Sequence, residues 1–122
     1  MEVKRGDVFL VNFDPARGSE QVGFRPAVVV QNDVGNRYSP TTIVIVVTTA
    51  AQKDYPFLVP LKAGEGGLKK DSAANAAQVL TVDKSRLARR LGSLSPEKMR
   101  QVNRALAVSL GLTGETAGVF SD

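Results

Sequence analysis

Short apolar runs alternate with polar, turn-forming segments along most of the chain. The runs are rich in valine, isoleucine and other β-prone residues, which is typical of strands. Six of them predict strands, at residues 8–13, 27–30, 42–49, 57–61, 76–82 and 88–94. The runs at 27–30 and 42–49 are continuous rather than alternating, so we expect both strands to be covered on both faces and to neighbour each other in the core.

One stretch near the C-terminus instead carries the period of an amphipathic helix. Ser95 is a good N-cap, Pro96 suits the first helical position, and Gly111 can close the helix. Apolar residues recur at helical spacing between them, at Met99, Val102, Leu106 and Leu110. A single helical turn is also expected at 83–87, with Asp83 as its N-cap.

The polar segments predict connections between these elements. Residues 32–40 are turn-rich and are expected to form a loop along one wall of a site. Residues 62–71, with three glycines and several charges, are expected to be a mobile loop. The alanine-rich stretch 73–77 has weak β propensity, which leaves open whether it is a regular strand. The pattern therefore predicts one domain, 1–122, of the mainly β (α+β) class: a small, strongly bent β-barrel with one principal C-terminal helix and one short helical turn.

Composition narrows the possible chemistry. The 122 residues include no cysteine and no histidine, which excludes disulfides, thiolate metal sites and histidine catalysis. The carboxylates are scattered, so we expect no metal site and no cofactor. The N-terminus has no apolar signal region and no window reaches 18 apolar residues, so we expect a cytoplasmic protein without membrane contact.

Charge points to an acidic partner. The formal net charge is +4, and basic residues cluster near segment ends, where a fold can gather them on one rim. These clusters are Lys4-Arg5, Arg17, Arg25, Lys69-Lys70, Arg86 and Arg89-Arg90. Arg25 also opens an apolar strand, and its planar fork of donors matches phosphate oxygens. Taken alone, this indicates an anion site; the alternative is a surface arginine that pairs with Glu20 or Asp33.

Five short motifs, in order along the chain, resemble the MazF/PemK toxins: Arg5-Gly6-Asp7-Val8, Gly18-Ser19-Glu20-Gln21, the run from Arg25 to Asn32, Thr48-Thr49 and the run from Gln78 to Lys84. The resemblance implies an SH3-like barrel, a homodimer, and a sequence-specific, ribosome-independent endoribonuclease that acts on mRNA as a toxin and is inhibited by a cognate antitoxin. It also implies that Arg25 and Thr48 are the catalytic pair. A basic groove suits an antitoxin with an acidic, disordered tail that competes with single-stranded RNA.

Cleavage without a metal can proceed by attack of the ribose 2′-oxygen on the adjacent phosphate, which gives a 2′,3′-cyclic phosphate and a 5′-hydroxyl. The reaction needs in-line geometry, stabilisation of the phosphorane charge and two proton transfers. Arginine keeps its proton, so Arg25 suits charge stabilisation and proton donation better than proton abstraction. Thr48 can donate a hydroxyl hydrogen bond to the same phosphate. The general base is left open between Glu20 and a bound water.

Eight residues are candidate RNA contacts: Ser19, Glu20, Gln21, Phe24, Asn32, Thr49, Gln78 and Arg86. Ser19, Glu20 and Gln21 belong to one loop. They would offer side chains or backbone N–H groups to a phosphate, or form an ordinary turn. Phe24 would stack on an unpaired base or be buried under the loop. Asn32, Thr49 and Gln78 would read base edges or cap strand ends. Arg86 would anchor a phosphate or remain a solvated charge.

Two other functions are compatible with the pattern. One is a non-catalytic toxin on the same barrel that poisons a protein target such as DNA gyrase through its C-terminal helix, and this toxin would not need the pair of Arg25 and Thr48. The other is a barrel that binds nucleic acid without cutting it, with a strongly salt-dependent affinity.

Overall fold

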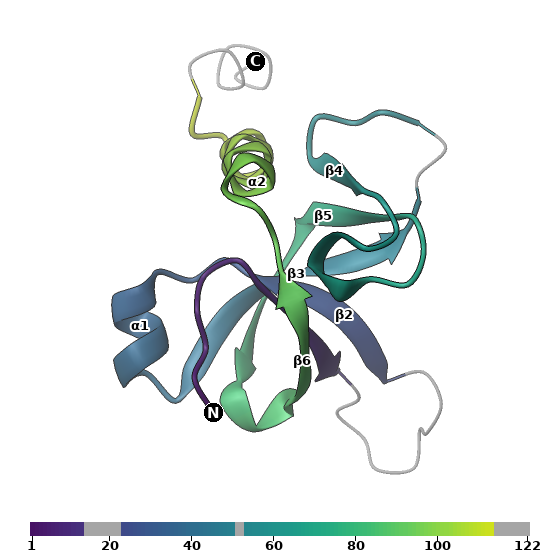
Figure 1. Ribbon diagram of the computed structural model, residues 1–122. Helices are drawn as coiled ribbons and strands as arrows, with labels where there is room; N and C mark the ends of the chain where they lie inside the picture. Colours follow the sequence, from purple (N-terminus) through teal and green to yellow (C-terminus); the bar gives the residue numbers. More distant parts are fainter. Residues whose placement is uncertain (14–22, 51–52, 114–122) are drawn as a thin grey trace.

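The computed structural model describes residues 1–13, 23–50 and 53–113. Its centre is a six-stranded antiparallel sheet in the order β4-β5-β3-β2-β1-β6. The strands are β1 (Asp7–Asn12), β2 (Phe24–Val29), β3 (Thr41–Thr49), β4 (Leu58–Leu61), β5 (Ser72–Asp83) and β6 (Leu87–Ser93). The sheet is strongly bent (Figure 1), which confirms the mainly β prediction. Within the described residues its edge strands, β4 and β6, do not pair with each other, so the sheet is not closed by hydrogen bonds.

β3 lies in the middle of the sheet and is buried on both faces, as its continuous apolar run predicted. Val44 to Val47 all have at most 4% of their surface exposed. The alternation of side chains directs Ile45 and Val47 into a core under helix α2, and Val44 and Val46 to the opposite face. The core on that opposite face contains Val3, Phe9, Val11, Ala27, Val29, Val44, Val82 and Leu87. The predicted neighbourhood of β2 and β3 is confirmed, since Ala27 pairs with Val46.

The alanine-rich stretch is a regular part of β5, which begins four residues before the predicted strand. Ala73, Ala74 and Ala76 are buried, because β5 pairs with β3 on one side and with β4 on the other. Pairing on both sides outweighs the weak β propensity of alanine. The β3–β5 register shifts between Ile45 and Val46, so the segment after Asn75 bulges.

The segment predicted as a polar loop at 32–40 contains a short helix, α1 (Asp33–Tyr38), so that prediction was wrong. Asn32 caps it, because its Oδ1 accepts a hydrogen bond of 2.7 Å from the backbone N–H of Gly35. Asn36 is buried, and its side chain anchors the helix to the sheet. Its Oδ1 accepts from Thr42 Oγ1 at 2.7 Å and from Gln31 Nε2 at 3.0 Å.

The connection expected to be a mobile loop is packed against the sheet. It contains a 3₁₀ turn, η2 (Glu65–Gly67), and a buried Leu68. Gly67 and Gly92 meet backbone to backbone: a Cβ on Gly67 would lie 1.9 Å from the carbonyl oxygen of Leu91. This backbone crossing links the connection between β4 and β5 to β6. It thus brings together the two edges of the sheet, which are not joined by strand pairing.

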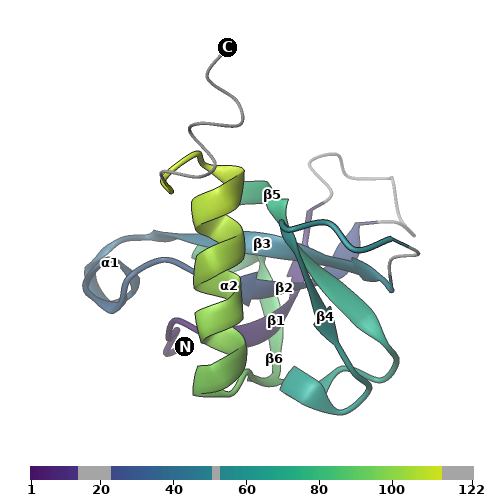
Figure 2. The same cartoon turned by 90° about the horizontal axis from the view of Figure 1, so that it is seen from above.

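Both predicted helical segments at the C-terminal end are confirmed. A 3₁₀ turn, η3 (Lys84–Arg86), follows Asp83, whose Oδ1 accepts from the Ser85 N–H at 2.9 Å. Helix α2 (Pro96–Ser109) is capped by Ser95, whose Oγ accepts from Lys98 N–H at 3.1 Å. The helix lies over one face of the sheet (Figure 2). None of the helices in the described ranges is long and apolar enough to cross a membrane.

Candidate active site

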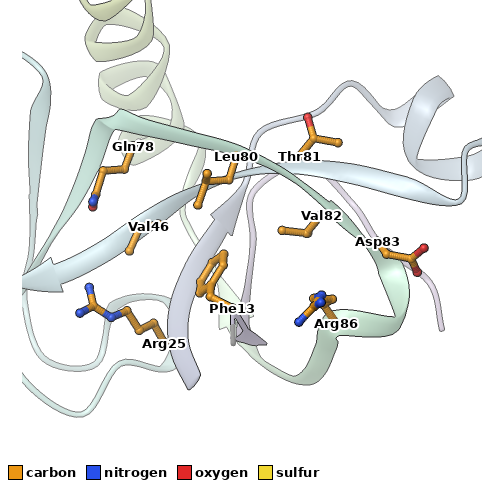
Figure 3. Close-up of a pocket in the computed structure, with 9 residues that line it drawn as sticks. All are labelled: Phe13, Arg25, Val46, Gln78, Leu80, Thr81, Val82, Asp83 and Arg86. Carbon is orange, nitrogen blue, oxygen red and sulfur yellow. The ribbon is translucent and has the colours of Figure 1, made fainter. Parts of the chain in front are cut away.

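A groove of about 550 Å³ runs over the face of the sheet that lies away from α2. Its lining comes from β2, β3, β5 and η3, together with Phe13 just after β1 (Figure 3). The lining residues are Phe13, Arg25, Val46, Gln78, Leu80, Thr81, Val82, Asp83 and Arg86. Three of the predicted site residues, Arg25, Gln78 and Arg86, are therefore brought together by the fold.

Arg25 reaches this face because of the strand register. It pairs with Val11 of β1, and Val11 belongs to the core on the same side of the sheet as the groove. Its side chain is exposed, and within the described part of the chain no hydrogen-bond or salt-bridge partner holds it. The predicted alternative, pairing with Asp33, is not seen, since Asp33 instead binds the Arg5 N–H at 2.7 Å. Glu20, the other alternative, lies outside the described residues. No described residue occupies the exposed guanidinium, which can therefore meet a phosphate.

Thr48 lies on the same face as Arg25. The β2–β3 pairing runs from Val29 and Val44 to Ala27 and Val46. Beyond these pairs, alternation along each strand keeps Arg25 on the face of Ala27 and Thr48 on the face of Val46, which is the groove face. Among the residues that the structure describes, the Thr48 hydroxyl donates only long bonds, of 3.3 Å to the Thr49 carbonyl and 3.4 Å to the Ala73 carbonyl. It can therefore turn toward a ligand at little cost.

Each end of the groove carries an arginine, and only the end at Arg86 also has a carboxylate. Arg25 marks one end, and Arg86 lies at the other, beyond the ring of Phe13 (Figure 3). Arg86 Nη1 donates to the Asn12 carbonyl at 3.2 Å, which fixes its position. Beside it, the N–H and hydroxyl of Ser85 lower the pKa of Asp83, and Arg86 adds to this effect. Arg86 is thus a positioned cation next to a carboxylate that stays ionised.

Gln78 lies beside Asn75, a residue outside the five family motifs. Asn75 Nδ2 donates to Gln78 Oε1 at 3.4 Å, and Asn75 lies opposite Val46 on the groove face. In the sequence, Asn75 stands out only as one amide among four alanines. It can be assigned to the groove face only once β5 is known to begin at Ser72. The two amides together offer donors and acceptors for base edges.

The remaining predicted RNA contacts lie elsewhere. Thr49 is exposed at the end of β3, outside the groove lining. Asn32 lies beyond the far end of β2 from Arg25, and its side chain caps α1. Phe24 is half exposed, at 51%, but alternation along β2 turns it to the face opposite Arg25. It is therefore neither buried under the loop nor directed into the groove. Ser19, Glu20 and Gln21 lie outside the described residues.

Metal-binding side chains do not converge in the part of the chain that the structure describes: it has no group of three or more aspartate, glutamate, histidine or cysteine residues placed to hold an ion. The polar donors of the groove are instead guanidinium and amide groups. Such donors match phosphate and base edges rather than a divalent cation.

A bent antiparallel sheet with a cationic groove and adjacent amides defines a small protein suited to binding a nucleic-acid strand. Residues 4–110 match the family of PemK-like, MazF-like toxins of type II toxin–antitoxin systems. The chain belongs to this family. A relative from Staphylococcus saprophyticus, named endoribonuclease MazF, is 46% identical over 111 residues, which cover 90% of this chain and 92% of the relative.

Solved structures agree with this assignment. An endoribonuclease from a mycobacterial species, in complex with its cognate antitoxin, is 27% identical with a TM-score of 0.75, and the match covers 91% of this chain and 97% of the other. A MazE–MazF structure from Deinococcus radiodurans is 29% identical with a TM-score of 0.75 and covers 93% of this chain and 99% of the other.

Proposed function

We propose that this protein is the toxin of a toxin–antitoxin pair and cuts single-stranded RNA, including mRNA, at specific sequences without ribosomes or metal. Endoribonuclease activity itself follows from the family and from the 46% identical relative of that name. The finer proposal is carried by one observation: side-chain alternation along β2 and β3 puts Arg25 and Thr48 on the same face of the sheet, beside a groove whose donors suit phosphate and bases.

In the proposed reaction the ribose 2′-oxygen attacks its own phosphorus while the bond from phosphorus to the 5′-oxygen breaks. The 2′-proton passes to a general base, and the 5′-oxygen receives a proton as it leaves. The products are a 2′,3′-cyclic phosphate and a 5′-hydroxyl. Arg25 stabilises the added charge of the phosphorane through its fork of donors and can supply the proton to the leaving oxygen. Thr48 donates a hydrogen bond to the same phosphate.

The general base is either Glu20 or a bound water, and the rest of the 18–21 loop would contact the phosphate flanking the scissile bond. Gln78, with its neighbour Asn75, would read base edges, and Arg86 would hold a phosphate at the far end of the groove; their shared position along the groove supports both roles. Thr49, close to Thr48 in sequence, would contact the nucleotide next to the scissile phosphate.

The reaction can be tested by incubating the purified protein with a long single-stranded RNA in excess EDTA. Discrete fragments with 5′-hydroxyl ends and cyclic phosphate ends are expected, and sequencing those ends would give the recognition sequence. Cleavage that appears only when magnesium is restored would contradict the metal-independent mechanism. Intact RNA under every condition would contradict the function.

The roles of the pair can be separated by substitution. Arg25→Ala is expected to lower kcat/KM about 10²- to 10³-fold, as loss of a transition-state donor does elsewhere. Arg25→Lys keeps the charge but loses the fork, so it should remain well below wild type. Arg104→Ala removes an exposed arginine from α2 and serves as the matched control. Full activity of Arg25→Lys would refute the phosphate-clamp role. Toxicity that survives Arg25→Ala would instead favour a non-catalytic action on a protein target.

The proposed partners are a second copy of this chain and an antitoxin with an acidic, disordered tail. The complexes of relatives with antitoxins support the second partner. A tail that occupies the cationic groove would exclude RNA, so adding it should suppress cleavage; RNA cleavage that continues at saturating tail would argue against overlapping sites. Light scattering tests the dimer. Action on mRNA implies a cytoplasmic location.

A further inference from the structure

A second cavity lies on the other face of β2 from the groove. It has a volume of about 280 Å³ and an apolar floor that includes Leu10, Pro26 and Leu91. Its rim carries three exposed cations, Lys69 and Lys70 from the connection after η2 and Arg89 from β6. We call this cavity the basic pocket. None of its three cations belongs to the predicted catalytic machinery.

The described part of the chain offers these three cations no counter-charge. Among the residues that the structure describes, no carboxylate pairs with the side chains of Lys69, Lys70 or Arg89. The nearest acidic residue in sequence, Asp71, accepts a hydrogen bond of 2.9 Å from the Ala63 N–H. Three cations gathered around an apolar floor repel one another unless an anion joins them. The basic pocket therefore suits an anionic ligand that also carries apolar surface.

The basic pocket opens on the opposite face of the sheet from the groove, but both reach the same end of β2. Pro26 lines the basic pocket and directly follows Arg25, which lines the groove. Ser72 lines its opposite wall and pairs with Thr49, the neighbour of Thr48. The basic pocket and the groove therefore meet the same ends of β2 and β3 from opposite faces of the sheet. Phe24, half exposed, points to this same face of β2.

We propose that the basic pocket binds the part of the single-stranded RNA that flanks the cleavage site, with phosphates on Lys69, Lys70 and Arg89 and a base over the apolar floor. The inference rests on the proposed function. An RNA that enters the groove must also leave it. The RNA beside the cleavage site carries negatively charged phosphates for the three cations and an apolar base for the floor of the basic pocket. Phe24 would offer a stacking surface beside the pocket. The acidic side chains of a peptide would meet only the charge requirement and not the requirement for apolar surface, so RNA is the better match.

The test compares wild type with the triple variant Lys69→Gln, Lys70→Gln, Arg89→Gln. A matched control, Lys62→Gln, Arg100→Gln, Arg104→Gln, removes the same charge from exposed positions outside the pocket. Both variants are assayed on a short RNA that contains only a mapped cleavage site and on the same site with long flanks. The triple variant should cut the short RNA like wild type and lose the advantage that wild type shows on the long RNA. The control should keep that advantage.

Salt dependence provides a second readout. Affinity is measured by fluorescence anisotropy on the long RNA with a 2′-deoxy nucleotide at the scissile position, which cannot be cut by 2′-oxygen attack. Loss of three phosphate contacts should reduce the slope of log affinity against log salt by about 2. Between 50 and 200 mM salt, the wild-type Kd should consequently rise about 20-fold more than that of the triple variant.

The outcomes separate this inference from the proposed function. Failure of wild type to cut either RNA would overturn the function on which it rests. If wild type cuts both RNAs and the triple variant matches it in length dependence and salt slope, the inference is wrong while the function stands. If the triple variant instead only weakens inhibition by an acidic peptide, the pocket belongs to a protein partner, and the RNA proposal is overturned.

Discussion

Replacing Gly67 with alanine should destabilise the protein far more than the same change at Gly64. Both glycines have positive φ, of 76° and 100°, so alanine pays a backbone cost of about 1–2 kcal/mol at either position. A Cβ at Gly64 meets nothing within 4 Å, whereas at Gly67 it would lie 1.9 Å from the Leu91 carbonyl oxygen. Because backbone cannot move aside like a side chain, we expect an added cost of about 1–3 kcal/mol.

Gly92 isolates the steric part of this cost. Its φ is not in the positive range, and a Cβ there would lie 2.7 Å from the Gly66 carbonyl carbon. Gly92→Ala should therefore cost about 1–3 kcal/mol without the backbone contribution, compared with about 2–5 for Gly67→Ala.

Urea unfolding followed by far-UV circular dichroism measures these differences, since the chain has no tryptophan. The shifts should appear in the midpoint with an unchanged m-value. Equal losses for Gly67→Ala and Gly64→Ala, or a loss below about 0.5 kcal/mol for Gly92→Ala, would refute the backbone crossing as a determinant of stability.

Two further predictions concern α1. Asn36→Ala leaves the buried Thr42 hydroxyl without its acceptor and removes one of the two acceptors of Gln31 Nε2, so it should cost about 1–3 kcal/mol in urea unfolding. Val34→Ala, at an exposed position of the same helix, should change little, and similar values for both would contradict the anchoring role. The N–H of Arg5 and, less strongly, the Asn36 amide lower the pKa of Asp33 below 3.8, so the ionised carboxylate stabilises the fold above that pH and the contribution disappears as pH falls through the lowered value. Asp33→Asn should therefore be less stable than wild type at pH 7, with a difference that closes in acid; a gap that persists at low pH would contradict the charge effect.

The strand pattern was predictable because β-branched runs and turn residues alternate clearly. The continuous run at 42–49 became a strand buried on both faces, since such a run has no polar side to expose. Ser95, Pro96 and Gly111 delimited α2 through local chemistry that does not depend on the rest of the fold. Asp83 likewise marked η3 by its own capping bond.

The elements that were missed depend on partners distant in the sequence. Helix α1 has no apolar period and is held by the buried amide of Asn36, which reaches Thr42 of β3. The alanines that begin β5 become a strand only because β3 and β4 pair on both sides of them. The motifs predicted Arg25 and Gln78 as site residues, and its charge and position suggested Arg86. Only strand alternation shows that Phe24 faces the other way.

The alternation that puts Arg25 and Thr48 on one face also limits which changes in the sequence of β3 the site can tolerate. A substitution of a buried valine in β3 weakens the core but leaves each remaining side chain on its own face. A deletion of one residue between Val44 and Thr48 would turn Thr48 to the α2 side, because side chains alternate with a period of two. We therefore expect functional relatives to vary in the sequence of this strand, but to carry insertions and deletions only outside it.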